Sequence, residues 1–277
     1  MKKWIIGVAV AVFGAWMVWS NKTVGLTQMK IQCDGLPSLF DGFRIAHISD
    51  LHNAEFGKDN CNLLATVRDS KPDIIAITGD IIDSRRTDID SALRTAESLA
   101  EIAPCYFVTG NHESRIAEYP ELRKGLEAAG VTVLDGRSVR LERGENSIIL
   151  AGFDDPSGKA VLVSDKYAEI AESELCALDE SLDGFSILLA HRPELIDVYA
   201  NHNIALVLSG HAHGGQFRLP FVGGLYVPNQ GLFPKYDSGI YNCKETEMIV
   251  SRGVGNSIMP VRFNNRPEII LVELKTK

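Results

Sequence analysis

Five short apolar segments of this chain are each followed directly by side chains of the types that bind metal ions. Each segment has the length and composition of a buried strand; the segments are residues 43–49, 73–78, 105–109, 185–190 and 204–208. Polar residues at the carboxyl ends of strands in an α/β sheet meet in one crevice. We therefore expect the residues that follow the five segments to lie together; they are Asp50, His52, Asp80, Asn111, His112, His191, His211 and His213.

Strands and helices alternate in the first half of the chain. Residues 60–70 and 90–103 carry apolar side chains at helical spacing, and each of these stretches is followed closely by a proline, Pro72 or Pro104. The strands around these two helices are continuous apolar runs, which are typical of parallel strands covered on both faces. The first half therefore predicts a parallel sheet with helices packed against it.

The second half is richer in strands. We expect strands near residues 131–134, 137–141, 147–153, 247–250 and 268–273, in addition to those named above. Helices are expected near residues 121–129, 166–182 and 194–201. The pattern predicts an α/β (α+β) fold of two stacked mixed sheets flanked by helices. No repeat or linker divides it, so we expect one catalytic domain over residues 23–277.

The N-terminal segment has the features of a membrane anchor. Lys2 and Lys3 precede sixteen uncharged, mostly apolar residues, 4–19, which span roughly 24 Å as a helix against about 30 Å of hydrocarbon. The three tryptophans of the chain bracket this run, as interfacial aromatics do. We favour an uncleaved anchor over residues 1–22. A cleaved signal peptide is the main alternative, and a buried amphipathic helix is disfavoured because the run has no polar face.

Charge and cysteine content exclude other classes of protein. The formal net charge of −8 disfavours binding to extended nucleic acid. The five cysteines form no C-x-x-C pair and their number is odd, so no disulfide framework is expected. The two positive charges at the N-terminus are expected to stay in the cytoplasm, which places the catalytic domain on the extracytoplasmic side of the cell membrane, or outside the cell if the segment is cleaved. The sequence does not indicate an oligomeric state.

The strand-end residues are chemically suited to a metal site. Any one of them alone would be read as a turn residue or a helix cap, but five independent strand ends of this kind are hard to explain as turns. Five of the seven histidines belong to these strand ends. A mixture of imidazole, carboxylate and amide ligands without thiolate suits Mn²⁺, Fe or Zn²⁺, whereas Mg²⁺ prefers fewer imidazoles.

The order of these motifs resembles the signature of the calcineurin-like metallophosphoesterase superfamily. The likeness to a bacterial membrane-associated or secreted, phosphodiesterase-like branch runs from about residue 25 to the C-terminus, and this resemblance implies a four-layer sandwich. The motifs that carry it are Asp50-x-His52, Gly79-Asp80-x-x-Asp83, Gly110-Asn111-His112-Glu113, His191 and Gly210-His211-x-His213.

The resemblance implies a site for two divalent metal ions. Asp80 would bridge the two ions, together with a water or hydroxide that acts as the nucleophile. The implied ligands are Asp50, His52 and His213 for the first ion and Asn111, His191 and His211 for the second.

The same resemblance assigns roles to two residues beside the ligands. His112 would donate a proton to the leaving-group oxygen or stabilise its charge. Asp83 would hydrogen-bond the other ring nitrogen of His112 and fix its tautomer; the structural alternative for Asp83 is a helix cap. Arg115 either meets a phosphate oxygen or is a solvated loop residue.

The expected activity is hydrolysis of a phosphodiester, with a lipid-linked or cell-envelope phosphoester as one candidate. Apolar residues after the last motif, such as Phe221 and Phe233, either favour such a substrate or belong to the core. The alternatives are a pyrophosphohydrolase of a nucleotide-linked lipid precursor, which requires an inward-facing catalytic domain, and a phosphomonoesterase. Outside the enzymes, a metal-stabilised binding or scaffold protein would have lost ligands or the catalytic histidine, and none is replaced here.

Overall fold

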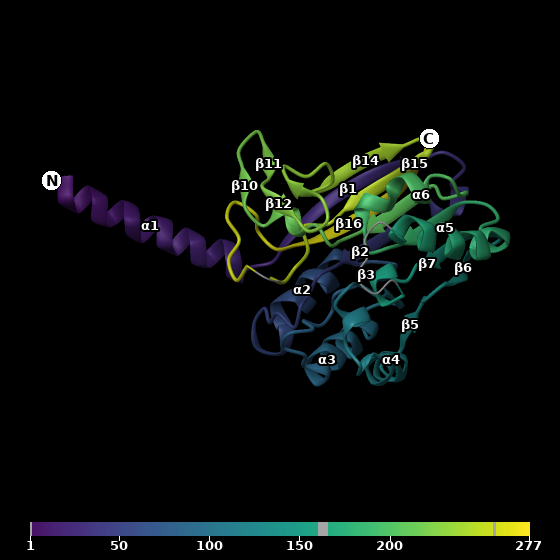
Figure 1. The fold of residues 1–277 in the computed structure, drawn as a ribbon, viewed down its shortest axis with the longest axis horizontal. Helices are drawn as coiled ribbons and strands as arrows, with labels where there is room; N and C mark the ends of the chain where they lie inside the picture. Colours follow the sequence, from purple (N-terminus) through teal and green to yellow (C-terminus); the bar gives the residue numbers. More distant parts are fainter. Residues whose placement is uncertain (1, 160–165, 257–258) are drawn as a thin grey trace.

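Two stacked six-stranded sheets form the body of the protein, and one long helix extends from it (Figure 1). The computed structural model describes residues 2–159, 166–256 and 259–277. Helices cover the outer face of each sheet, so the body has helix, sheet, sheet and helix layers. The predicted fold of two stacked mixed sheets flanked by helices is confirmed.

The first sheet has the strand order β1-β16-β2-β3-β4-β5. The strands from β2 to β5 run parallel, as the sequence predicts, and β16 is antiparallel to β2 and parallel to β1. The bounds are β1 (Gly25–Cys33), β2 (Arg44–Ile48), β3 (Ile74–Thr78), β4 (Cys105–Val108), β5 (Val131–Val133) and β16 (Glu268–Thr276).

The second sheet has the strand order β14-β15-β9-β8-β7-β6. The four inner strands run parallel to one another, and each edge strand is antiparallel to the inner strand beside it. The bounds are β6 (Arg137–Arg143), β7 (Asn146–Gly152), β8 (Ser186–Leu189), β9 (Leu206–Ser209), β14 (Gly239–Cys243) and β15 (Thr246–Val250).

Two small hairpins lie between β9 and β14. One pairs β10 (Arg218–Leu219) with β11 (Gly223–Gly224), and the other pairs β12 (Tyr226–Val227) with β13 (Gly231–Leu232). The sequence did not predict these hairpins, because strands of two residues are too short to show an alternating pattern. It also missed the edge strand β14.

The helices follow the predicted order. The side chain of Asp88 caps α3 by accepting a hydrogen bond of 2.9 Å from the Ser91 N–H. α2 ends just before Lys71, which has a left-handed backbone and precedes Pro72. The bounds are α1 (Lys2–Lys22), α2 (Cys61–Ser70), α3 (Ile89–Ala100), α4 (Tyr119–Ala128), α5 (Tyr167–Leu178) and α6 (Ile196–Tyr199).

The core is built in three layers of apolar side chains. Strand β3 shows why: Ile75 and Ile77 pack against α2, α3 and α4, while Ile74 and Ala76 face the second sheet. Successive side chains of a strand point to opposite faces, so a strand covered on both sides is apolar throughout. A third cluster fills the space between the second sheet and the helices α5 and α6. The carboxyl ends of the central strands of both sheets therefore meet between the layers.

Among the described residues, α1 is the single helix that is long and apolar enough to cross a membrane. Its side chains are almost all exposed to solvent along the span Lys3–Lys22. Only its last turns touch the body, where Ser20 is buried. Length and composition suit a membrane anchor and a signal sequence equally.

Truncation of a core side chain should test the packing of the first sheet. Phe107 on β4 is fully buried among the helices that cover this sheet. We expect Phe107→Ala to lower the free energy of unfolding by about 3–5 kcal/mol, because it leaves a cavity. The measurement is urea unfolding of the full chain in detergent, followed by circular dichroism. The control Thr132→Ala, at an exposed position of the adjacent strand, should stay within about 0.5 kcal/mol; equal losses for both variants would contradict the assignment.

Candidate metal centre

The chain turns sharply where the strands end, and the predicted ligands occupy these turns. Five of them have positive φ angles between 47° and 64°. Non-glycine residues adopt this left-handed conformation only when surrounding contacts hold it, so such strain collects at functional sites. The five residues are Asp50, His52, Asp80, His211 and His213.

Two glycines allow the strand ends to approach one another. A Cβ atom at Gly210 would lie 1.8 Å from the Ser49 Oγ, and one at Gly110 would lie 2.3 Å from an Asp80 carboxylate oxygen. No side chain fits at these distances. The motif glycines are therefore required by the close packing of neighbouring turns.

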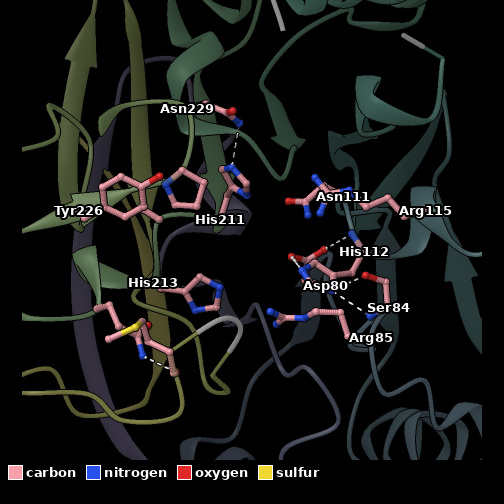
Figure 2. Close-up of a pocket in the computed structure, with 14 residues that line it drawn as sticks. Asp80, Ser84, Arg85, Asn111, His112, Arg115, His211, His213, Tyr226 and Asn229 are labelled. Atoms are coloured by element: carbon pink, nitrogen blue, oxygen red, sulfur yellow. Dashed lines mark hydrogen bonds and ion pairs between the residues drawn. The ribbon is translucent and has the colours of Figure 1, made fainter. Parts of the chain in front are cut away.

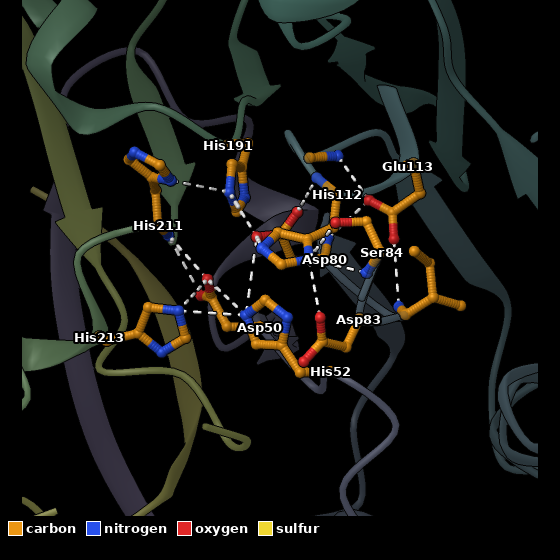
Figure 3. A network of polar contacts seen from close by, with 12 residues as sticks. Asp50, His52, Asp80, Asp83, Ser84, His112, Glu113, His191, His211 and His213 are labelled. Atoms are coloured by element: carbon orange, nitrogen blue, oxygen red, sulfur yellow. Dashed lines mark hydrogen bonds and ion pairs between the residues drawn. The ribbon is translucent and has the colours of Figure 1, made fainter. Parts of the chain in front are cut away.

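A first group of ligating atoms forms around Asp50. The Nε2 atom of His213 lies 3.3 Å from Asp50 Oδ1 and 3.1 Å from the Nε2 atom of His52. Both carboxylate oxygens of Asp50 accept the backbone N–H of His211 at 3.1 Å. The three side chains are buried and converge on one point (Figure 3).

A second group forms around Asp80. The Nε2 atom of His191 lies 3.2 Å from Asp80 Oδ2 and 3.2 Å from His211 Nδ1. The other nitrogen of His191 is 2.7 Å from the Thr78 carbonyl, so it must carry a proton, and Nε2 is the nitrogen that offers a lone pair once the ring is neutral. Asp80 Oδ2 is also 3.6 Å from His52 Nε2, which places this carboxylate between the two groups.

The residues present fit two divalent cations. Ring nitrogens that face each other at 3.1–3.2 Å, beside two buried carboxylates, form a donor set that a cation would satisfy. The buried Oδ1 atom of Asn111 makes no hydrogen bond within the described part of the chain. Amide and carboxylate oxygens together with imidazole are ligands for Mn²⁺, Fe and Zn²⁺.

His112 lies beside the second group and is oriented by the loop after β3. The backbone N–H of Ser84 donates a hydrogen bond of 2.9 Å to His112 Nδ1, and the Ser84 hydroxyl lies 3.1 Å from the same atom. The nearest carboxylate oxygen of Asp83 is 3.5 Å from this nitrogen. Because Nδ1 accepts a hydrogen bond, a neutral His112 carries its proton on Nε2, which is 4.0 Å from Asp80 Oδ2.

Glu113 holds the loops that carry Asp80 and His112. Its fully buried carboxylate accepts the backbone N–H groups of Asp80, Ile82 and Gly110, at 2.7, 3.2 and 2.8 Å. Burial and the nearby Asp80 charge raise the pKa of Glu113 to about 8. The glutamate of the Gly-Asn-His-Glu motif therefore holds the loop after β3 and the loop after β4 together.

Two fully buried arginines flank the histidine pair of the last motif. Arg192 is paired with Asp155 at 2.7 Å and approaches His211 Nε2 at 3.4 Å. Arg262 donates to the Arg252 carbonyl at 2.7 Å and approaches His213 Nδ1 at 3.4 Å. Burial and these guanidinium charges hold the pKa values of His211 and His213 well below the usual range, so both rings stay neutral.

The pKa values of the other ionisable groups of the cluster shift in opposite directions. Burial raises the pKa of Asp50 to about 6 and lowers that of His52 to about 3. Burial opposes a charge on His191 and on Asp80, but their mutual attraction outweighs it. This attraction raises the pKa of His191 to about 10 and holds that of Asp80 well below its usual range.

A cleft of about 560 Å³ opens over this cluster. Figure 2 shows its two walls: His211, His213, Tyr226 and Asn229 lie on one side and Asn111, His112, Arg115, Ser84 and Arg85 on the other. The first wall comes from β9 and the hairpins that follow it, and the second from the loops after β3 and β4. Asp80, Ala212, Gln216, Pro228 and Met259 also line the cleft.

The structure brings all the candidate ligands named from the sequence into one buried cluster, with His112 and Asp83 beside it. Arg115 lines the cleft. Sequence reasoning did not assign roles to Ser84, Glu113, Arg192 or Arg262. The arginine after His191 is adjacent to a motif and could have been noticed, whereas Arg262 gives no signal because it is remote in sequence and lies in no motif.

Comparisons with known proteins agree with this arrangement. Residues 43–215 match the family model of the calcineurin-like phosphoesterases. The uncharacterized metallophosphoesterase YkuE of Bacillus subtilis is 32% identical over 90% of this chain and 85% of its own length. A transmembrane protein with metallophosphoesterase domain from Danio rerio is 30% identical over 98% of this chain, which spans 61% of that relative.

The chain is also similar to another bacterial protein and to a solved structure. The phosphodiesterase YaeI of Escherichia coli is 29% identical over 84% of this chain and 82% of its own length. The crystal structure of TT1561 from Thermus thermophilus superimposes with a TM-score of 0.51 at 16% identity, covering 76% of this chain and 90% of that one. This last likeness shows the fold.

A methyl group at Gly210 should disturb the first group of ligating atoms. The Cβ of Gly210→Ala would lie 2.5 Å from Asp50 Oδ2, so the carboxylate has to move. We expect the dissociation constant for Mn²⁺ to rise about 10–100-fold, as it does when groups that orient ligands are changed. The measurement is calorimetric titration of the metal-free chain. Gly14→Ala, whose Cβ meets nothing within 4 Å, should bind Mn²⁺ like the unmodified chain; unchanged affinity in both variants would contradict the geometry.

Metal binding should release protons in a number that depends on pH. Ligating groups must lose their protons, and in the metal-free chain His191 has a pKa of about 10 and Asp50 one of about 6. We therefore expect release of about two protons per chain at pH 5 and about one at pH 8 when Mn²⁺ binds, with affinity falling as pH falls. Calorimetry in buffers of different ionisation enthalpy measures this number. Release of only about one proton at pH 5 would show that Asp50 is already charged at that pH.

Proposed function

Because this chain belongs to the calcineurin-like phosphoesterase family, whose members are metal-dependent hydrolases of phosphoester bonds, we propose that it cleaves a phosphodiester. The observation that carries the proposal is the convergence of two ligand groups on Asp80 at the floor of an open cleft. Such a cleft admits a phosphorus atom with substituents on two sides. The 29% identity to a protein named as a phosphodiesterase supports the same substrate class.

We assign seven residues to the metal site in two sets that share Asp80. When bound, two divalent ions polarise the phosphoryl group and lower the pKa of a water molecule. Mn²⁺, Fe or Zn²⁺ suits this donor set. The first set is Asp50, His52 and His213, and the second is Asn111, His191 and His211.

His112 is the proposed proton donor to the leaving group. Ser84 holds Nδ1 as an acceptor, so the Nε2 proton points to the side of the ring that faces Asp80 and the cleft. In its neutral form the ring donates this Nε2–H in a hydrogen bond that stabilises the negative charge on the departing oxygen; a ring that carries a second proton on Nδ1 can pass its Nε2 proton to that oxygen and return to the neutral form. Asp83 lies within ion-pair distance of Nδ1, and its charge stabilises the ring if the ring takes up a second proton. Arg115, on the same wall, can contact a non-bridging phosphate oxygen.

We further propose that residues 1–22 are an uncleaved anchor and that residues 23–277 form the catalytic domain on the extracytoplasmic side of the cell membrane. The length and exposure of α1 support the anchor, as does the 30% identity to a relative named as a transmembrane protein. The branch of the family would then be membrane-associated, and a lipid-linked or cell-envelope phosphodiester would lie within reach of the cleft.

Activity measurements on matched substrates test this function. The full chain in detergent is stripped of metal, reloaded with Mn²⁺ and assayed with bis(p-nitrophenyl) phosphate and p-nitrophenyl phosphate. We expect metal-dependent turnover that favours the diester. His112→Ala should lower kcat by about 100–10,000-fold through loss of the proton donor, with unchanged metal content by mass spectrometry.

His202→Ala provides a matched control, because His202 pairs with Asp179 outside the cleft. It should leave kcat unchanged. Full activity of His112→Ala would overturn the role of His112, and preference for the monoester would overturn the substrate class while keeping the metal chemistry.

A further inference from the structure

Eight of the eleven large apolar side chains that are exposed outside α1, among the described residues, belong to the segments around the mouth of the cleft. Phe221, at the tip of the β10–β11 hairpin, is fully exposed, and Phe233, just after β13, is 61% exposed. Soluble surfaces rarely keep such side chains together unless they contact a partner or a membrane. We call these eight side chains the apolar rim: Leu219, Phe221, Val222, Tyr226, Leu232, Phe233, Met259 and Val261.

The apolar rim is continuous with the catalytic cleft. Tyr226 and Met259 belong to the rim and also line the cleft. The side chain of Gln216, three residues after His213, donates hydrogen bonds to the carbonyls of Met259 and Val261 at 2.9 and 3.0 Å. A molecule that leaves the rim therefore enters the cleft directly.

The rim is also fastened to the C-terminal end of α1. The Asn21 side chain donates to the Arg262 carbonyl at 3.0 Å and accepts the Arg262 N–H at 2.7 Å. The ring of Trp16 meets the ring of Phe263 edge-on at 5.7 Å. The backbone carbonyl of Phe263 in turn accepts the N–H of Arg218, at the start of β10, at 3.0 Å. Figure 1 shows β10, β11 and β12 at the end of the body from which α1 extends.

These contacts fix how deep the rim lies relative to α1. Trp16 precedes Lys22 by six residues, which is about 9 Å along a helix at 1.5 Å per residue. If Lys22 marks the outer edge of the headgroup layer, which is about 5–8 Å thick, Phe263 lies near the boundary between the headgroups and the hydrocarbon. The guanidinium of Arg266 stacks on the ring of Trp19 at 4.7 Å, a pairing suited to that layer.

The charge of this region suits an anionic lipid surface. Residues 214–236 and 249–267 contain no Asp or Glu, although the chain has 36 acidic residues and a net charge of −8. Lys22 and Lys235 are exposed next to the apolar segments. Basic side chains that flank exposed apolar ones are attracted to anionic headgroups.

We propose that the apolar rim inserts into the interfacial layer of the bilayer that α1 crosses, so that the cleft receives a lipid phosphodiester directly from that layer. This inference rests on the proposed anchor and on the proposed phosphodiesterase function. The lipid's apolar chain stays among the rim side chains while its phosphate reaches the cleft. Water and the diester then yield a phosphomonoester and an alcohol, one of which remains in the membrane.

The depth of the rim can be measured without any catalysis. In a background in which Cys61, Cys176 and Cys243 are replaced by Ser, the variants Phe221→Cys and Phe233→Cys are labelled with a nitroxide. The full chain is reconstituted into vesicles of phosphatidylethanolamine and phosphatidylglycerol. Electron paramagnetic resonance power saturation should show that both labels are more accessible to oxygen than to an aqueous nickel complex.

Leu39→Cys is the matched control, because Leu39 is also exposed but lies beyond the far end of β1 in the 3₁₀ turn Ser38–Phe40. β1 begins three residues after α1 and has nine residues, about 30 Å of strand. The control label should be aqueous. Aqueous labels at all three positions would overturn the proposal, and so would labels at Phe221 and Phe233 that are shielded from both oxygen and the nickel complex, since these would indicate contact with protein instead of lipid.

A pair of substrates then tests delivery to the cleft. Hexadecyl p-nitrophenyl phosphate is embedded in the vesicles, and bis(p-nitrophenyl) phosphate is dissolved in water. We expect Phe221→Asp combined with Phe233→Asp to lower turnover of the embedded diester at least about tenfold, because two apolar contacts with the bilayer are lost. Turnover of the soluble diester should not change, since neither residue lines the cleft.

The two experiments separate the inference from the function on which it rests. Equal turnover of the embedded diester by the variant and the unmodified chain would overturn delivery through the rim, and so would equal losses on both substrates. Lack of turnover on either substrate by the unmodified chain would instead count against the proposed function, and the nitroxide depths would still decide whether the rim lies in the membrane.

Discussion

Burial of the two carboxylates Asp50 and Asp80 is the constraint on which the site depends. Both are buried at strand ends, where water cannot solvate their charge. Imidazole nitrogens and backbone N–H groups are the nearby atoms that stabilise this charge. Satisfying these carboxylates requires strands from both sheets to end at one place and to leave in left-handed turns. The stacking of the sheets and the strained turns at their ends therefore both help to stabilise two buried negative charges. Bound divalent cations would neutralise what remains of this charge.

The arginines that flank the histidine pair are held by partners of their own. Arg192 is anchored by Asp155 and Arg262 by backbone carbonyls, so neither needs a histidine to satisfy its charge. Each guanidinium instead keeps the adjacent ring neutral, which preserves a lone pair for metal. Arg262 also shares its backbone groups with Asn21 of α1. A single residue thus joins the long apolar helix to the wall of the metal cluster, and the orientation of that helix and the geometry of the site are mechanically linked.

The sequence predicts the ligand cluster well because two independent signals coincide. An apolar run marks each strand, and a change to Asp, Asn or His marks its end, so parallel topology brings Asp50 and Asp80 together, and the stacking of the two sheets adds His191. The remaining features depend on contacts between segments far apart in the chain. The Ser84 N–H that sets the tautomer of His112 is a backbone group without a residue-type signature. Arg262 lies 49 residues from His213, and only folding shows that it is buried beside that ring. Hairpins of two-residue strands carry no periodicity at all.

The residues that line the cleft differ in how firmly they are held: those that follow the central strands are fixed, and those of the β12–β13 hairpin are not. The ligands project from strands that are paired on both sides in the middle of each sheet, so their geometry is fixed by the whole core. Tyr226, Pro228 and Asn229 come from a hairpin with two paired residues on each strand, outside both large sheets. Changes in such a hairpin leave the sheets intact, because loops tolerate substitution far better than paired strands do. Under the proposed function, substitutions among residues 216–235 would alter which phosphoester enters while the strands that carry the proposed metal ligands keep their positions.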